Sequence, residues 1–185
     1  MQMALDEMVV ALEAALRTAE IPHAFGGAIA LAYYATPRGT VDVDINLFVP
    51  VGDFDRVLAA LVPLGVELPS GELRRVAVRD EQVRLTWQAT PLDLFFSYDA
   101  LHEACMERRR QVPFGGEKLA ILSAEDLAIF KVLFARDKDW RDLREMLFAQ
   151  GERFDRGYAI GWLERIVAPD DERLARFGSL FVESS

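Results

Sequence analysis

Thr40-Val41-Asp42-Val43-Asp44-Ile45-Asn46-Leu47-Phe48-Val49 is the most informative stretch of this chain. It predicts a β-strand that carries two acidic residues. Side chains alternate along a strand with a period of two, so Asp42 and Asp44 project to the same side. Two carboxylates on one side can bind one cation or two adjacent cations. The stretch therefore predicts a metal-binding strand.

A glycine pair precedes this strand. Phe25 ends a short strand, Gly26 and Gly27 form a turn, and an apolar helix extends to Tyr34. Glycines allow the backbone to approach a ligand closely, and the amides at the start of a helix attract phosphate. Pro37-Arg38-Gly39 then ends the helix. This order predicts a phosphate-binding turn followed directly by the metal-binding strand.

A third carboxylate occurs further along the chain. Asp93 is the single acid in the apolar, aromatic-rich strand Pro91-Leu92-Asp93-Leu94-Phe95-Phe96. Acids are rarely buried without a partner, and hydrogen bonds or a metal would offset the desolvation cost. Three carboxylates on neighbouring strands beside a glycine turn suit divalent-metal phosphoryl chemistry, because hard oxygen ligands hold Mg²⁺. Asp42, Asp44 and Asp93 are therefore the expected catalytic and metal-binding residues.

The order of these motifs resembles the signature of the polymerase β-type nucleotidyltransferase superfamily. The closer resemblance is to the toxin-like nucleotidyltransferases of the bacterial AbiEii/AbiGii abortive-infection group, and it spans about residues 20 to 147. The segments that carry it are Gly-Gly-Ala-Ile-Ala-Leu-Ala-Tyr at 26–33, Arg-Gly-Thr-Val-Asp-Val-Asp at 38–44, Glu125-Asp126-Leu127, Lys131, Arg136 and Lys138-Asp139-x-x-Asp142.

The resemblance implies transfer of an NMP from an NTP to an acceptor hydroxyl, with Mg²⁺ or Mn²⁺ as cofactor. Asp42 and Asp44 would hold the metal that bridges the triphosphate, and together with Asp93 they would hold a second metal. Asp93 can alternatively act as a general base. Gly26 and Gly27, with the helix behind them, would position the β and γ phosphates.

Four further residues receive cofactor-binding roles from the resemblance. Arg38 and Lys131 would neutralise the charge that develops on the phosphates. Thr40 would hydrogen-bond a phosphate or a carboxylate. Asp139 accompanies Lys131 in the family pattern, although the two can equally form a pair on a helix surface.

Several functions remain open on this scaffold. One is a toxin-like enzyme that modifies tRNA or another RNA, with a cognate antitoxin protein as a partner. A second is a nucleotidyltransferase for a small cationic antibiotic of the aminoglycoside or lincosamide type, which an acidic surface would suit. A third is a protein that keeps the fold but only binds a nucleotide or a partner. Each motif also has a plainer interpretation, because most glycine pairs are only turns and most Asp-x-Asp pairs lie on solvated strand faces.

Composition narrows these classes only slightly. The net charge of −9 over 185 residues argues against broad, sequence-independent nucleic-acid binding, although a local basic channel is compatible with it. Arg108-Arg109-Arg110 is interpreted as charge at a helix end. The single Cys105 excludes an internal disulfide and a cysteine zinc cluster. No apolar run is long enough for a membrane span and no basic signal segment precedes Asp6, so we expect a cytoplasmic protein.

The expected fold class is α/β (α+β), with a nucleotidyltransferase-type mixed sheet flanked by helices and a C-terminal helical subdomain. We place the catalytic core at residues 1–112 and the helical subdomain at 113–185. The residue pattern further predicts the following elements: a helix over 3–19, a strand over 23–25, a helix over 53–64, a hairpin of 73–78 with 83–88, a strand over 90–97, and helices after Ser123.

Overall fold

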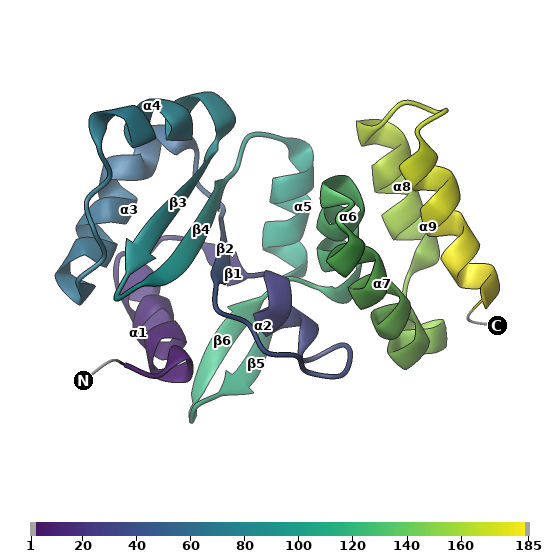
Figure 1. Ribbon diagram of the computed structural model, residues 1–185, viewed down its shortest axis with the longest axis horizontal. Helices are drawn as coiled ribbons and strands as arrows, with labels where there is room; N and C mark the ends of the chain where they lie inside the picture. Colours follow the sequence, from purple (N-terminus) through teal and green to yellow (C-terminus); the bar gives the residue numbers. More distant parts are fainter. Residues whose placement is uncertain (1–2, 184–185) are drawn as a thin grey trace. The chain divides into compact units, whose positions relative to one another are not determined.

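The computed structural model describes residues 3–183. The chain forms two compact units (Figure 1). The first unit contains the residues up to Ile29 together with Gly39–Leu122. The second contains Ala30–Arg38 together with the residues from Ser123 onward. The chain therefore passes from the first unit to the second twice.

A mixed sheet forms the centre of the first unit. Within the described residues it has the strand order β3-β4-β2-β1-β6-β5. The strands are β1 (His23–Phe25), β2 (Val43–Leu47), β3 (Gln82–Trp87), β4 (Thr90–Phe96), β5 (Arg110–Phe114) and β6 (Glu117–Ile121). β1 pairs with β6 and β2 pairs with β4 in parallel, while the other neighbours are antiparallel. The expected mixed α/β core is confirmed.

Helices cover the sheet of the first unit. They are α1 (Leu5–Thr18), α3 (Phe54–Leu61), α4 (Gly71–Asp80) and α5 (Ala100–Arg108). α1 buries Met8, Leu12 and Leu16, which lie four residues apart and so share one face of the helix. The expected helix over 3–19 and the expected strand over 23–25 are confirmed.

The hairpin expected over 73–88 is wrong. Residues 71–80 form α4, because the Ser70 hydroxyl accepts a hydrogen bond from the Leu73 amide at 3.1 Å and so caps a helix. Glu81, with φ of 53°, ends it. The hairpin is instead β3 with β4, joined at Gln88 and Ala89, which both have positive φ, 49° and 68°. The alternating pattern of residues 73–78 is short, and the N-cap outweighs it in favour of a helix.

The second unit is helical, as expected for the C-terminal subdomain. Its helices are α6 (Ala124–Phe134), α7 (Asp137–Gln150), α8 (Arg156–Ile166) and α9 (Glu172–Glu183). The expected boundary at 112/113 differs from the observed division at Leu122 and Ser123. The reason is that residues 110–121 form β5 and β6, an unexpected hairpin that pairs with β1 and so extends the sheet.

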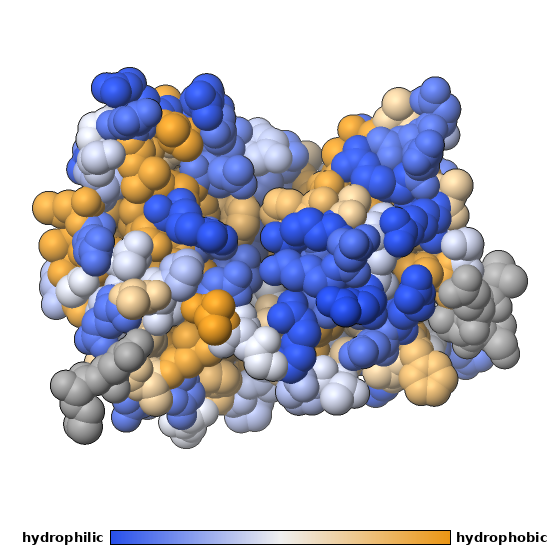
Figure 2. Space-filling model, viewed as in Figure 1, coloured by the Kyte–Doolittle hydropathy of each residue, from blue (hydrophilic) through white to orange (hydrophobic). Residues whose placement is uncertain are grey.

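No helix among residues 3–183 is both long enough and apolar enough to cross a membrane. Figure 2 shows that hydrophilic residues gather over α7 on the face in view. Cys105 is buried within α5, consistent with a packing residue.

Candidate functional site

Two of the expected carboxylates are brought side by side by strand pairing in the first unit. β2 and β4 are parallel neighbours, and their register pairs Asp44 with Asp93. The residues that flank Asp44, Val43 and Ile45, are fully buried, while both aspartates lie on the half-buried face of the sheet. Paired residues of neighbouring strands project to the same side. The two carboxylates therefore share one face of the sheet.

The glycine turn lies directly against this pair. The Gly26 amide donates a hydrogen bond to the Asp44 carbonyl at 2.9 Å. Gly27 has φ of +51°, and a Cβ atom at this position would lie 1.8 Å from Asp44 Oδ2. Glycine is thus required at position 27 both by backbone conformation and by close approach. The close approach expected at this turn is made to the Asp44 carboxylate.

The helix after the turn is shorter than expected. α2 (Gly27–Leu31) ends three residues before Tyr34, the expected end. The Tyr33 and Tyr34 amides bond to the carbonyls of Ala30 and Leu31, as in a tight turn. Five residues supply little helix dipole. The turn therefore offers little helix dipole to a phosphate, and the Gly26 amide is already bonded to the Asp44 carbonyl.

Asp93 has a partner that the sequence interpretation did not assign to it. Arg84 lies directly opposite Asp93 in the β3–β4 register. Its Nε and Nη2 donate to Asp93 Oδ1 and Oδ2 at 2.7 and 2.6 Å. The Arg84 side chain is 62% exposed and that of Asp93 is 17% exposed. Arg84 falls within the segment 83–88 that the sequence pattern paired with 73–78, so that pairing did not place it beside Asp93. The β3–β4 register would have indicated this pair, because it places Arg84 opposite Asp93.

All three expected carboxylates act on the Arg84 guanidinium. The hydrogen bonds and charge of Asp93 raise the pKa of Arg84, and the charges of Asp42 and Asp44 raise it further. The Arg84 guanidinium thus lies within the electrostatic influence of all three aspartates, and Asp93 contributes most.

Asp42 lies just before β2 and is held by Thr40. The Thr40 hydroxyl donates to Asp42 Oδ1 at 2.5 Å, which is the carboxylate alternative expected for this threonine. Among residues 3–183, no three His, Cys, Asp or Glu side chains are already arranged as a metal-ligand group. Carboxylate oxygens are the hard ligands that divalent cations such as Mg²⁺ prefer, so the chemistry of the donors suits such a cation.

The remaining expected residues, Arg38, Lys131 and Asp139, lie in the second unit and belong to an ion-pair network. Lys131 Nζ lies 2.6 Å from Asp142 Oδ2 and 3.6 Å from Asp139 Oδ1. Arg38 donates from Nε and Nη2 to the two oxygens of Asp142, each at 3.0 Å. The side chains of Lys131 and Asp139 are only 5% and 1% exposed, so they are not a helix-surface pair.

Asp142 is the centre of this network, although it was not among the expected site residues. Burial raises the pKa of its carboxyl group, but hydrogen bonds from Arg38 and Lys131 and the charges of these two residues outweigh that effect, and the net pKa is lowered. Asp139 and Asp142 are three residues apart on α7 and so share one face of the helix. That spacing was a signal in the sequence.

The architecture built from these elements is a nucleotidyltransferase fold. The solution structure of the antibiotic-resistance factor ANT(2'')-Ia is similar, with a TM-score of 0.62 and 15% identity over 87% of this chain and 92% of that chain. A crystal structure of ANT(2'')-Ia in complex with adenylyl-2''-tobramycin has a TM-score of 0.59 and 13% identity, over 97% and 98% of the two chains.

A third similar structure is an antigenic nucleotidyltransferase-like protein from Paracoccidioides brasiliensis. Its TM-score is 0.53 with 16% identity, over 97% of this chain and 87% of that chain. No protein-family model matches the chain, and no curated protein sequence matches it. At these identities the similarity establishes the fold, and the resemblance to the AbiEii/AbiGii group stays a prediction.

Proposed function

We propose that this protein transfers an NMP group from an NTP to an acceptor hydroxyl in a divalent-metal-dependent reaction. The observation that carries the proposal is the β2–β4 register, which pairs Asp44 with Asp93 beside the Gly26-Gly27 turn. The nucleotidyltransferase fold supports the same reaction class.

In this proposal, Asp42, Asp44 and Asp93 hold the metal. Bound Mg²⁺ or Mn²⁺ would neutralise phosphate charge and lower the pKa of the acceptor hydroxyl. Asp44 is positioned for this role by its contact with Gly27, and Asp42 by the Thr40 hydroxyl. Asp93 can serve instead as the general base that accepts the hydroxyl proton. In either role it must first release Arg84.

Gly26 and Gly27 would position the phosphates through their backbone. The roles expected for Arg38, Lys131 and Asp139 in nucleotide binding stay predictions. For Arg38 and Lys131, a phosphate would have to compete with the Asp142 carboxylate that both residues bind.

A small cationic acceptor is the substrate class that we favour. The net charge of −9 attracts cations, and the fold matches ANT(2'')-Ia, solved with adenylyl-2''-tobramycin, over nearly the whole of both chains. An RNA acceptor such as tRNA, with a cognate antitoxin, is the alternative that the AbiEii/AbiGii resemblance suggests. A non-catalytic nucleotide-binding or partner-binding protein would also keep this fold.

The test is a transfer assay with each of four α-³²P-labelled NTPs and Mg²⁺, offering an aminoglycoside panel and total tRNA as separate acceptors. Asp44→Asn should abolish transfer while the melting temperature stays within a few degrees of wild type. Asp6→Asn makes the same change at an exposed position of α1 and is the matched control.

The result separates the alternatives. Label on an aminoglycoside supports the favoured acceptor, and label on tRNA supports the RNA-modifying function. Metal-dependent NTP binding without transfer to either acceptor would favour a binding role. Equal activity in wild type and Asp44→Asn would overturn the proposed site.

A further inference from the structure

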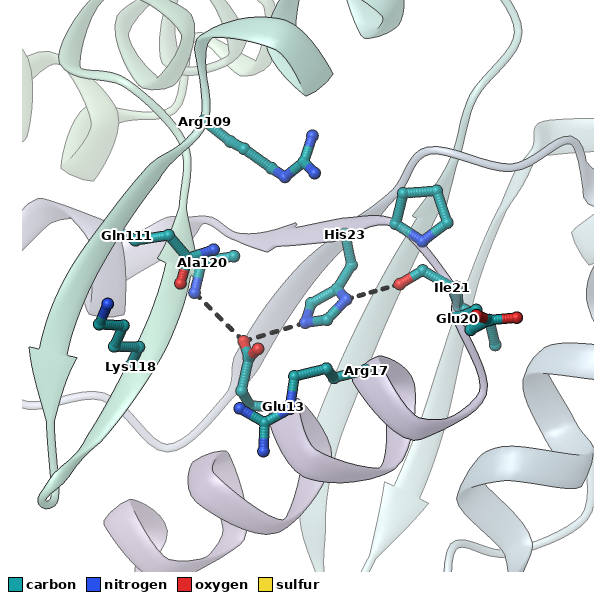
Figure 3. A pocket seen from close by; sticks show the side chains of 10 residues that line it. Glu13, Arg17, Glu20, Ile21, His23, Arg109, Gln111, Lys118 and Ala120 are labelled. Carbon is teal, nitrogen blue, oxygen red and sulfur yellow. Dashed lines mark hydrogen bonds and ion pairs between the residues drawn. The ribbon is translucent and has the colours of Figure 1, made fainter.

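A hollow lies on the first unit, where α1 and the β5–β6 hairpin border the start of β1 (Figure 3). Its volume is about 490 Å³. His23 is the first residue of β1 and lines this hollow, whereas Gly26 and Gly27 follow the last residue of the same strand. The hollow is therefore at the opposite end of β1 from the glycine turn. It is separate from the site proposed for nucleotidyl transfer.

A buried ion pair forms the floor of the hollow. His23 Nδ1 lies 2.8 Å from the Ile21 carbonyl oxygen, and its Nε2 lies 3.0 Å from Glu13 Oε2. Burial raises the pKa of Glu13, but the hydrogen bond and charge of His23, with the Ala120 amide, outweigh this effect and lower it overall. The Ile21 carbonyl can only accept a hydrogen bond, so His23 Nδ1 is the donor to it, and a single proton lies between His23 Nε2 and Glu13 Oε2.

This pairing cancels the charge of Glu13. His23 and Glu13 share one proton, so the pair carries no net charge, and Glu13 Oε2 also accepts the Ala120 amide at 3.1 Å. The floor is therefore electrically neutral, and it cannot neutralise cations at the rim. Both side chains are almost fully buried, which fixes the shape of the floor.

Three cations surround this neutral floor. Figure 3 shows Arg17 from α1, Arg109 from the end of α5 and Lys118 from β6 around the Glu13–His23 pair. Glu20 is the remaining acidic residue of the lining, so the rim carries an excess of positive charge. In a chain of net charge −9, such an excess is a local exception. Arg109, one of the three consecutive arginines, thus lines this hollow as well as lying at the end of α5.

A neighbouring hollow of about 530 Å³ adjoins the first one, and Glu117 is the charged residue that it adds to the lining. Arg17, Gln111 and Lys118 line both hollows. Gln111 adds an exposed amide donor between the cations. The volume of the first hollow lies within the range of small-molecule sites, about 300–1,000 Å³.

We propose that this hollow is a binding site for the phosphate group of a small anionic ligand. Arg17, Arg109 and Lys118 supply the positive charge, because guanidinium and ammonium groups are the side chains that bind phosphate most strongly. Gln111 donates a further hydrogen bond. Ile21 and Pro22 supply an apolar wall for the rest of the ligand. This assignment holds whether or not the protein transfers nucleotides.

The test is an NMR titration of ¹⁵N-labelled protein, without divalent metal, with inorganic phosphate and with glucose 6-phosphate. The Ala120 amide reports directly on the site because it bonds to Glu13. Glucose is the uncharged control ligand. Salt at about 0.15 M shortens the Debye length to about 8 Å and so suppresses diffuse attraction.

The variant is Arg109→Gln/Lys118→Gln, in which both changed residues are exposed, and its matched control is Arg75→Gln/Arg79→Gln on exposed positions of α4. We expect saturable shifts at Ala120 and Gln111 with both phosphates and none with glucose. The dissociation constant should rise at least about tenfold in the first variant, equivalent to about 1.4 kcal/mol, and stay unchanged in the control. Shifts that do not saturate, that survive in the first variant, or that occur only at Gly26 and Gly27 would overturn the assignment.

Discussion

Arg84 and Asp93 face each other across the β3–β4 pair and form a two-pronged ion pair of 2.7 and 2.6 Å. The guanidinium thus occupies both oxygens of a carboxylate to which we assign metal binding. Arginine cannot lose its proton at accessible pH, so it can leave Asp93 only by moving. Since Arg84 is largely exposed, that movement is sterically open. A metal ion bound by Asp93 would therefore compete with the Arg84 guanidinium for the carboxylate.

Arg84→Gln should therefore strengthen Mn²⁺ binding. An exposed ion pair contributes about 0.2–1 kcal/mol, so the dissociation constant should fall by about 1.5- to 5-fold. Electron paramagnetic resonance of free Mn²⁺ measures this change. Arg79→Gln is the control, because Arg79 pairs with its exposed neighbour Asp80. Equal affinity in Arg84→Gln and wild type would show that Arg84 does not compete for the site.

Gly27→Ala should disable the site through Asp44. The new Cβ would lie 1.8 Å from Asp44 Oδ2 and would also strain a backbone with φ of +51°. We expect a stability loss of about 1–3 kcal/mol in urea unfolding and loss of transfer activity. Gly52→Ala is matched, because no atom lies within 4 Å of a Cβ there. A fully active Gly27→Ala protein would contradict the close-contact role of this glycine.

Asp142→Asn should destabilise the second unit. It leaves the buried Lys131 ammonium without its nearest carboxylate, at 2.6 Å, and removes one of the two oxygens that accept hydrogen bonds from Arg38. Removing one partner of a buried ion pair costs about 3 kcal/mol. Urea unfolding measures the change, with Asp170→Asn at an exposed position as control. A loss no larger than that of the control would mean that the network adds little stability.

The pH dependence of this variant has a defined sign. The pKa of Asp142 is lowered in the folded protein, so its contribution to stability is present above the unfolded-state pKa, near 3.8. It is lost as pH falls through the lower folded-state value. Unfolding curves of wild type and Asp142→Asn should therefore converge below about pH 4. A constant difference between them down to pH 2 would contradict the assigned shift.

Ala89→Gly should stabilise the β3–β4 hairpin. Ala89 is exposed and has φ of 68°, a conformation that costs a non-glycine residue about 1 kcal/mol. We expect a gain of about 0.5–1 kcal/mol in urea unfolding. The same substitution at Ala59, an exposed position inside α3, should instead cost about 1 kcal/mol. Destabilisation by both substitutions would mean that the turn does not hold Ala89 under strain.

The sequence was sufficient for the elements whose signals are local. The mixed sheet with a C-terminal helical part, and the strand His23–Phe25 with its exact bounds, were predicted correctly. The half-buried positions of Asp44 and Asp93 follow from strand alternation within each segment. Asp42, Asp44 and Asp93 as metal ligands stay a prediction, although their charges converge on Arg84.

The features that could not be predicted from the sequence depend mostly on pairing between separate segments of the chain. The β5–β6 hairpin carries mostly exposed residues on β5, so no apolar pattern indicated a strand there. Residues 73–78 alternate as a strand would, but the Ser70 N-cap makes this segment the helix α4. The partner of Asp93 required the β3–β4 register, and the partner of Arg38 lies 104 residues away. Such contacts are properties of the folded chain, which a local pattern does not record.

The double passage of the chain between its two units has a consequence for synthesis on the ribosome. Arg38 is made early, but its partner Asp142 follows 104 residues later. At about 5–20 residues per second, this delay is about 5–20 s. During that interval the first unit acquires all its strands, while Ala30–Arg38 must wait for the helices of the second unit. The segment between the glycine turn and β2 is thus among the last to reach its native contacts.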